Sequence, residues 1–214
     1  MHISEGVMTA PVLAAGAVLA AGGMYVGLRR LDPSQLPKTA LMAAVFFVAS
    51  LIHVPVGVSS AHLLLNGMIG LLLGWAAFPA IFVALALQAI LFQFGGLLVL
   101  GLNTFDMAMP GVLCYALFGG LAASSRRPLA LAGGFATGFV GVLLSALFTA
   151  CALALAGQEF VSSAQALFIS HVPIMFAEAI ITAVIVGFLG KVRPAMLHDA
   201  RLASAAAAQS GSNV

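Results

Sequence analysis

The sequence predicts an all-α integral membrane protein with seven transmembrane helices, its N-terminus outside and its C-terminus in the cytoplasm. Three observations support this prediction: the composition, the spacing of the apolar runs and the positions of the basic residues. Of the 214 residues, 63% are apolar and only 7% are charged, against roughly a quarter charged in an ordinary soluble domain. So few charges cannot cover a water-soluble globule of this size. Soluble, disordered and nucleic-acid-binding proteins are therefore excluded.

Apolar runs separated by polar or helix-breaking residues define the spans in chain order. A transmembrane helix needs about 20 predominantly apolar residues, so a chain of this length has room for several. The seven expected spans cover residues 7–28, 39–52, 62–73, 78–94, 111–123, 129–156 and 164–190.

Each break between the runs has a recognisable cause. A pair of arginines closes the first run, and prolines interrupt the turn over residues 31–38. The second run ends at a His-Val-Pro sequence, and Pro79 marks a tight break after the short third run. A Gly-Gly pair opens a loop that we expect to extend to Pro110. The fifth run ends at an Arg-Arg-Pro sequence, a polar loop at 157–163 precedes the seventh, and Lys191 closes that last run.

The basic residues give the orientation. With seven spans, every Lys and Arg falls on one side of the membrane, and the tendency of these residues to remain inside makes that side cytoplasmic. We therefore expect one transmembrane domain over residues 1–195, followed by a flexible cytoplasmic tail over 196–214. The basic residues are Arg29, Arg30, Lys38, Arg126, Arg127, Lys191, Arg193 and Arg201.

The opposite side of the membrane collects nitrogen and oxygen donors. It has four of the five histidines and no Lys or Arg, so no fixed cation there repels a metal ion. The residues expected on this outer side are His2, Glu5, His53, His62, Asn103, Asp106, Glu159 and His171.

Met1 and His2 form the most specific candidate for metal binding. The terminal amine of Met1, the amide nitrogen of His2 and the Nδ1 atom of its ring can close two fused chelate rings on one ion. A second imidazole would complete a planar set of four nitrogens, and His62, at the outer entry to the third span, is our choice. Planar nitrogen coordination favours nickel, copper and low-spin cobalt over zinc, magnesium and calcium. The alternative, that His2 stands at this position by chance, is left open by these residues alone.

Five further residues are candidates for the surroundings of the metal rather than for its ligands. His53 ends the second span before a proline, and Asn103 and Asp106 lie in the expected outer loop. His171 and Glu178 are seven residues apart and so share a helix face. Glu178 stands inside an apolar span, where an ionisable group is a functional candidate by default.

Several motifs together resemble one family, the CbiM/NikM proteins, and CbiM most closely. These proteins are the substrate-binding subunits (S-components) of energy-coupling factor transporters for cobalt and nickel. The resemblance extends over residues 1–195. The motifs are Met1-His2-Ile3 with Glu5-Gly6, His62 after Ser-Ser-Ala, Gly101-x-Asn103-Thr-Phe105-x-Met107, and His171-Val-Pro followed by Glu178-Ala-Ile-Ile-Thr182.

The resemblance implies a seven-helix S-component in the cytoplasmic (inner) membrane whose N-terminus enters the binding pocket. It implies that Met1, His2 and His62 hold Co²⁺, or Ni²⁺, as the transported substrate, with no separate cofactor. It also implies partners: a transmembrane coupling protein, two cytoplasmic ATPase subunits and a small accessory membrane protein. The chain contains no phosphate-binding loop of its own, so ATP hydrolysis is expected on the partners and no catalytic residue is assigned.

Two alternatives belong to other classes. The first is a carrier that works alone on an ion gradient, with His171 and Glu178 moving protons. The second is an intramembrane serine protease of the rhomboid type, which would need Ser59 or Ser60 as a nucleophile paired with a histidine. We interpret these serines instead as caps of the third helix.

Overall fold

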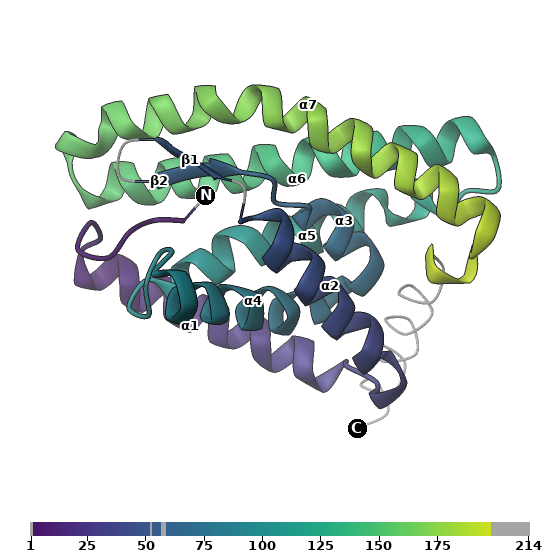
Figure 1. Cartoon of the computed structure of the whole chain (residues 1–214), viewed down its shortest axis with the longest axis horizontal. Helices are drawn as coiled ribbons and strands as arrows, with labels where there is room; N and C mark the ends of the chain where they lie inside the picture. Colours follow the sequence, from purple (N-terminus) through teal and green to yellow (C-terminus); the bar gives the residue numbers. More distant parts are fainter. Residues whose placement is uncertain (1, 52, 57–58, 198–214) are drawn as a thin grey trace.

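The computed structural model describes residues 2–51, 53–56 and 59–197, with the backbone alone for 53–56 and 59–61. Met1 and residues 198–214, most of the expected tail with Arg201, lie outside the described residues. Helices dominate, and one short antiparallel β-hairpin is present (Figure 1). The elements are α1 (Ala10–Arg29), η1 (Pro33–Gln35), α2 (Leu36–Ala49), β1 (His53–Val56), β2 (Ser59–His62), α3 (Asn66–Leu73), η2 (Gly74–Ala76), α4 (Ala77–Phe92), α5 (Leu100–Ala122), α6 (Arg127–Ala156), η3 (Gln158–Phe160) and α7 (Val161–Val192).

A helix forms in each of the seven expected runs, but the helices differ greatly in length. Five described segments are long and apolar enough to cross a membrane. In contrast, α2 has 14 residues and α3 has 8, about 21 and 12 Å of helix against a hydrocarbon core of about 30 Å. The five segments are Ala10–Arg29, Asn66–Phe92, Leu100–Ala122, Arg127–Ala156 and Gln158–Val192.

The segment Asn66–Phe92 folds back on itself. Gly74, with φ 56° and ψ −127°, ends α3 in a conformation that suits glycine. The ring of His2 lies against both His62, which precedes α3, and Phe94, which follows α4. The two ends of the segment therefore return to the same region, and α3 is a short buried helix rather than half of a straight span.

Close helix contacts surround α3. A Cβ atom on Gly70 would come within 2.1 Å of the carbonyl oxygen of Gly111 on α5, and one on Gly67 within 2.4 Å of the carbonyl oxygen of Thr137 on α6. Side chains larger than hydrogen at these positions would separate the helices. The backbones approach closely here, as they do in many membrane proteins.

Two expectations about local structure are wrong. The loop expected up to Pro110 is instead helical from Leu100, with Pro110 inside α5. Neighbouring helices satisfy the backbone around a proline in membrane proteins, and glycines in this stretch pack against α1 and α3. The segment with Ser59 and Ser60 is strand β2 and does not cap a helix, because α3 begins only at Asn66. The β-hairpin pairs His53 with His62 and Val56 with Ser59.

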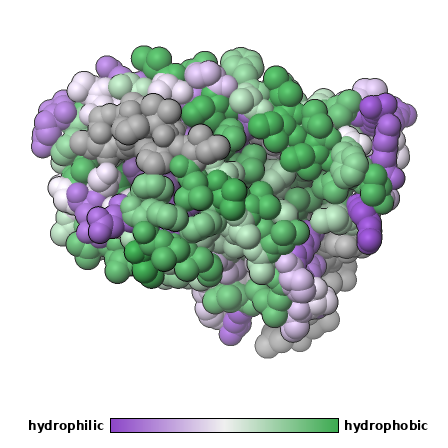
Figure 2. All heavy atoms as spheres, viewed as in Figure 1, coloured by the Kyte–Doolittle hydropathy of each residue, from purple (hydrophilic) through white to green (hydrophobic). Residues whose placement is uncertain are grey.

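The surface agrees with a membrane environment. Large apolar side chains are exposed along the helices, among them Val18 at 71% and Leu155 at 73%. In Figure 2 apolar residues cover most of the middle of the visible face, and hydrophilic residues gather toward its ends. Exposed apolar surface of this extent is rare on soluble monomers, so lipid is its natural solvent.

Candidate metal-binding site

The N-terminal segment is inserted into the protein rather than lying on it. His2 is 5% exposed and Ile3 is fully buried. The side chain of Asn103 on α5 pairs with the backbone of Ile3 in both directions: Asn103 Oδ1 accepts from the Ile3 N–H at 3.0 Å, and Asn103 Nδ2 donates to the Ile3 carbonyl at 3.2 Å. Asn103 therefore holds the segment that carries His2, and it does so from a helix and not from the expected loop.

The loop between α4 and α5 also holds the N-terminal segment in place. The Glu5 N–H donates to the Gly95 carbonyl at 3.1 Å, and the Leu98 N–H donates to Glu5 Oε1 at 2.9 Å. Gly95 and Gly96 both have positive φ, and a Cβ on Gly96 would collide with the side chain of Glu5. Glycine is therefore required for the loop to come this close to the N-terminus.

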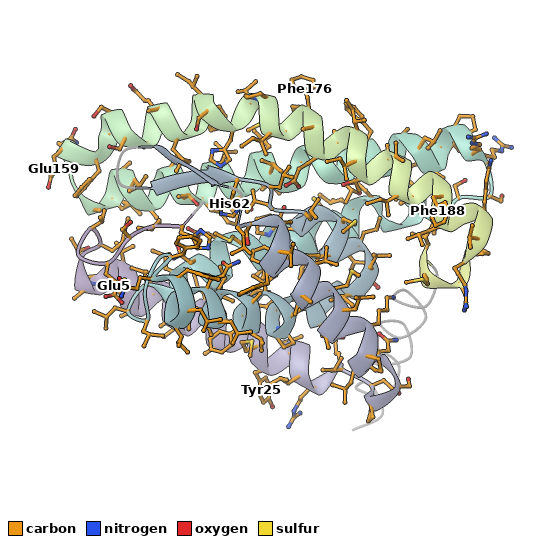
Figure 3. The ribbon with its side chains drawn as sticks, viewed as in Figure 1. Glu5, Tyr25, His62, Glu159, Phe176 and Phe188 are labelled. Atoms are coloured by element: carbon orange, nitrogen blue, oxygen red, sulfur yellow. The ribbon has the colours of Figure 1, made fainter. Side chains whose placement is uncertain are left out.

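The two histidines predicted as ligands meet inside the protein. The ring centroids of His2 and His62 are 4.7 Å apart with planes inclined at 33°, although the residues are far apart in the sequence. His62 comes from the end of β2 and is 2% exposed. In Figure 3 it lies in the interior, while Phe176, Phe188 and Tyr25 lie at the periphery. Met1, the third predicted ligand residue, is outside the described residues.

The ring of His62 has one nitrogen engaged and one available. Its Nδ1 lies 2.9 Å from the carbonyl oxygen of Leu63, which can only accept, so Nδ1 carries the proton. Its Nε2 is buried and has no hydrogen-bond partner among the described residues. Burial, as the main cause, lowers the pKa of His62 well below its ordinary value. A neutral imidazole with a buried, unpaired nitrogen is suited to bind a metal ion.

Gln88 is part of the site, and we did not predict it from the sequence. This fully buried side chain on α4 places its Oε1 atom 2.9 Å from Nε2 of His2. Its amide nitrogen donates to the Phe47 carbonyl at 3.1 Å and to the hydroxyl of Ser50. The signal that could have revealed it is a polar amide inside the apolar run 78–94, where an unpaired polar group is costly.

Two of the other predicted residues lie close to the turn that follows His62 or on the same helix. His171 and Glu178 lie buried on α7, and Glu178 Oε1 accepts from the backbone N–H groups of Leu64 (a short contact) and Leu65 (2.8 Å). Leu65 has a positive φ of 51°, a strained conformation for a bulky residue. Glu178 thus anchors the turn that follows His62.

His171 donates from Nδ1 to the Leu167 carbonyl at 2.7 Å, and its Nε2, like Glu178 Oε2 and Thr182 Oγ1, has no partner among the described residues. Asp106 faces Thr149 on α6 at 3.4 Å and lines a cavity of about 350 Å³ between α1, α5 and α6. The structure thus does not bring Asp106 to the histidines. The backbone of His53 pairs with that of His62, but its side chain lies outside the described part.

A conventional cluster of side-chain ligands is missing from the described residues. No group of three His, Cys, Asp or Glu side chains comes together there to hold a metal ion. What the described residues offer is a pair of imidazoles next to the buried N-terminal backbone. This donor set consists of nitrogens, which suit late transition metals better than Mg²⁺ or Ca²⁺.

The chain is similar to known metal transport proteins. The chain is 46% identical over 200 residues to a protein of Haemophilus influenzae named "Putative metal transport protein", with 92% of this chain and 97% of that protein covered. It is 33% identical to "Fused nickel transport protein NikMN" of Rhodobacter capsulatus, with 96% of this chain and 66% of that longer protein covered. A solved structure described as "Crystal Structure of an transition metal transporter" superposes with a TM-score of 0.77 at 26% identity, covering 90% of this chain and 93% of that one.

Fold, site and relatives together define the class: a multi-pass membrane protein that transports transition metals. Within this class, the family model described as "Cobalt uptake substrate-specific transmembrane region" matches residues 2–196. The chain belongs to this family, CbiM, and is a cobalt/nickel transport protein.

Proposed function

We propose that this chain is the subunit that captures Co²⁺, or Ni²⁺, at the outer face of the cytoplasmic membrane, in a planar site of four nitrogens. The Met1 amine, the His2 amide and Nδ1, and the Nε2 atom of His62 are the proposed ligands. The observation that carries this proposal is the buried pair of His2 and His62, 4.7 Å apart, with the His62 Nε2 unpaired among the described residues. Desolvating an imidazole nitrogen without a partner is costly, and a bound metal ion offsets that cost.

The experiment changes only the start of the chain. One residue added before Met1 displaces the amine and moves the histidine out of the two-ring geometry, so bound nickel or cobalt and its visible spectrum should be lost. The matched control carries one additional residue at the C-terminus and should bind like the unmodified protein. Undiminished binding and an unchanged spectrum in the N-terminally extended form would refute the ligand set.

The orientation proposed is N-terminus outside. The C-terminal ends of α1 and α7 and the N-terminal end of α6 lie at the same end of the bundle (Figure 1). Lys38 also reaches the Met196 carbonyl at 3.4 Å, and Arg127 and Lys191 line one cavity of about 390 Å³ there. Basic residues gathered at one end support a cytoplasmic position for it. A cysteine introduced at the exposed residue Glu159, next to α7 at the other end, should react with an impermeant reagent added to whole cells.

We further propose that uptake is powered by partners of the energy-coupling factor type: a transmembrane coupling protein, two ATPase subunits and a small accessory membrane protein. The membership in a family described as substrate-specific supports this division of labour. Reconstituted vesicles should accumulate nickel or cobalt only when these subunits and ATP are present. Uptake by the chain alone on an ion gradient, without ATP, would instead establish the carrier alternative.

A further inference from the structure

We propose that Gln88, held by Ser50 and the end of α2, fixes the tautomer of His2 and thereby presents its Nδ1 atom to the metal. Gln88 is then a positioning residue for metal capture. The inference rests on the proposed function, because it concerns a ligand of the proposed site. It follows from the direction of each hydrogen bond in a buried series that connects the end of α2, through Ser50 and Gln88, to the ring of His2.

This series of hydrogen bonds begins at the C-terminus of α2. The last carbonyl groups of a helix have no partner within it. Here the hydroxyl of Ser50 donates to the Phe46 carbonyl at 2.7 Å. A hydroxyl has one proton to donate, so its lone pairs remain to accept from the amide nitrogen of Gln88.

The amide of Gln88 can adopt only one orientation in this setting. One end of the amide group lies 3.1 Å from the carbonyl oxygen of Phe47 and also contacts the hydroxyl oxygen of Ser50. Both of these oxygens accept hydrogen bonds here. The NH₂ group must therefore point to α2. The Oε1 atom then necessarily points to His2, where it lies 2.9 Å from the ring Nε2.

The orientation of the amide decides where the proton of His2 resides. Because Gln88 Oε1 has no hydrogen to give, Nε2 of His2 must be the donor. In a neutral imidazole the other nitrogen, Nδ1, then carries the lone pair that a metal ion requires. Only Nδ1 is close enough along the side chain to share an ion with the backbone nitrogen of the same residue.

The side chains of this series are buried away from solvent. Gln88 and Ser50 are fully buried and His2 is 5% exposed, so water does not compete for these groups. Partners of this kind orient metal-bound histidines elsewhere, and their loss typically lowers metal affinity about 10–100-fold. His62 shows the complementary arrangement: its Nδ1 donates to Leu63 and its Nε2 is available.

The first test needs no variant. In the metal-free, full-length protein in lipid bilayers, ¹⁵N solid-state NMR of labelled histidine should show His2 protonated at Nε2, with its signals assigned by their loss in His2→Ala. A ring protonated at Nδ1 would overturn the proposal, whatever any variant does.

The second test compares Gln88→Met, which keeps the size and removes the acceptor, with Gln165→Met, the same change at an exposed position of α7. Titration with Ni²⁺ should show an affinity about 10–100-fold lower for the first variant, with a shifted visible band, and no change for the second. Equal affinity and spectrum in wild type and Gln88→Met would overturn the inference.

A third variant separates chemistry from packing and serves if Gln88→Met does not fold. Gln88→Glu retains an oxygen facing His2, so it should keep the Nε2-protonated tautomer. It should bind Ni²⁺ more tightly than Gln88→Met. If Gln88→Met does not fold, Gln88→Glu should still bind Ni²⁺ with measurable affinity. Loss of the tautomer in Gln88→Glu would contradict the assignment. If the wild type has the expected tautomer but binds no metal, the proposed function fails and not the role of Gln88 in orienting the ring.

Discussion

Replacing Glu178 by leucine should destabilise the protein strongly, because one carboxylate oxygen satisfies two buried backbone donors. Its Oε1 atom accepts from the N–H groups of Leu64 and Leu65, and Glu178 is fully buried. Each buried donor left without a partner costs about 1–3 kcal/mol. Glu178→Leu should therefore lower the free energy of unfolding by about 2–6 kcal/mol, while Glu178→Gln, which keeps an accepting oxygen, should lose less than half as much.

The assay is reversible unfolding in mixed detergent micelles, followed by helix content. Glu159→Leu is the control, because this glutamate next to α7 is exposed. Nickel affinity should fall together with stability, since the anchored turn follows directly on His62. A Glu178→Leu protein within about 0.5 kcal/mol of wild type, the usual range for surface substitutions, would refute the reasoning.

Three further outcomes follow from the contacts. Asn103→Leu removes both hydrogen bonds that hold the backbone of Ile3, so Ni²⁺ affinity measured by titration should drop at least about tenfold, which needs only 1.4 kcal/mol; Asp106→Asn, one helical turn further along α5, should leave it unchanged. Gly70→Ala should lower the free energy of unfolding by about 1–3 kcal/mol, because its Cβ would meet backbone. Gly22→Ala, with nothing within 4 Å, should be neutral or stabilising in the same assay. Calorimetry in buffers of different ionisation enthalpy should detect proton release on Ni²⁺ binding, since the amide of His2 must be deprotonated; binding without release would exclude the amide as a ligand.

Part of the site could be predicted from local chemistry. A histidine directly after a methionine with a free amine has a chelating geometry that depends only on bonds within two residues, and it needs no fold to be recognised. His62 could be chosen because it stands at the expected outer end of a span. The structure brings its ring to that of His2, while metal binding by the pair stays a prediction.

The interior partners could not be predicted in this way. Gln88 and Ser50 are polar residues in two separate, mostly apolar runs, and only the packing of α4 against the end of α2 joins them. The helical conformation of residues 100–110 was likewise missed. Glycine, asparagine and proline favour loops in water, but buried neighbours satisfy them here as a helix.

Composition and the spacing of apolar runs are enough to predict that this chain is helical, that it belongs in a membrane and that its basic residues lie on one side, because these properties sum over many residues and tolerate errors at each. Only the packing of distant segments makes α3 a short helix folded back from α4, buries His2 and Ile3, and brings the rings of His2 and His62 together. Those features depend on single contacts between residues far apart in the chain, made at distances of about 3 Å where donor and acceptor cannot be exchanged. No local pattern of residues contains that information.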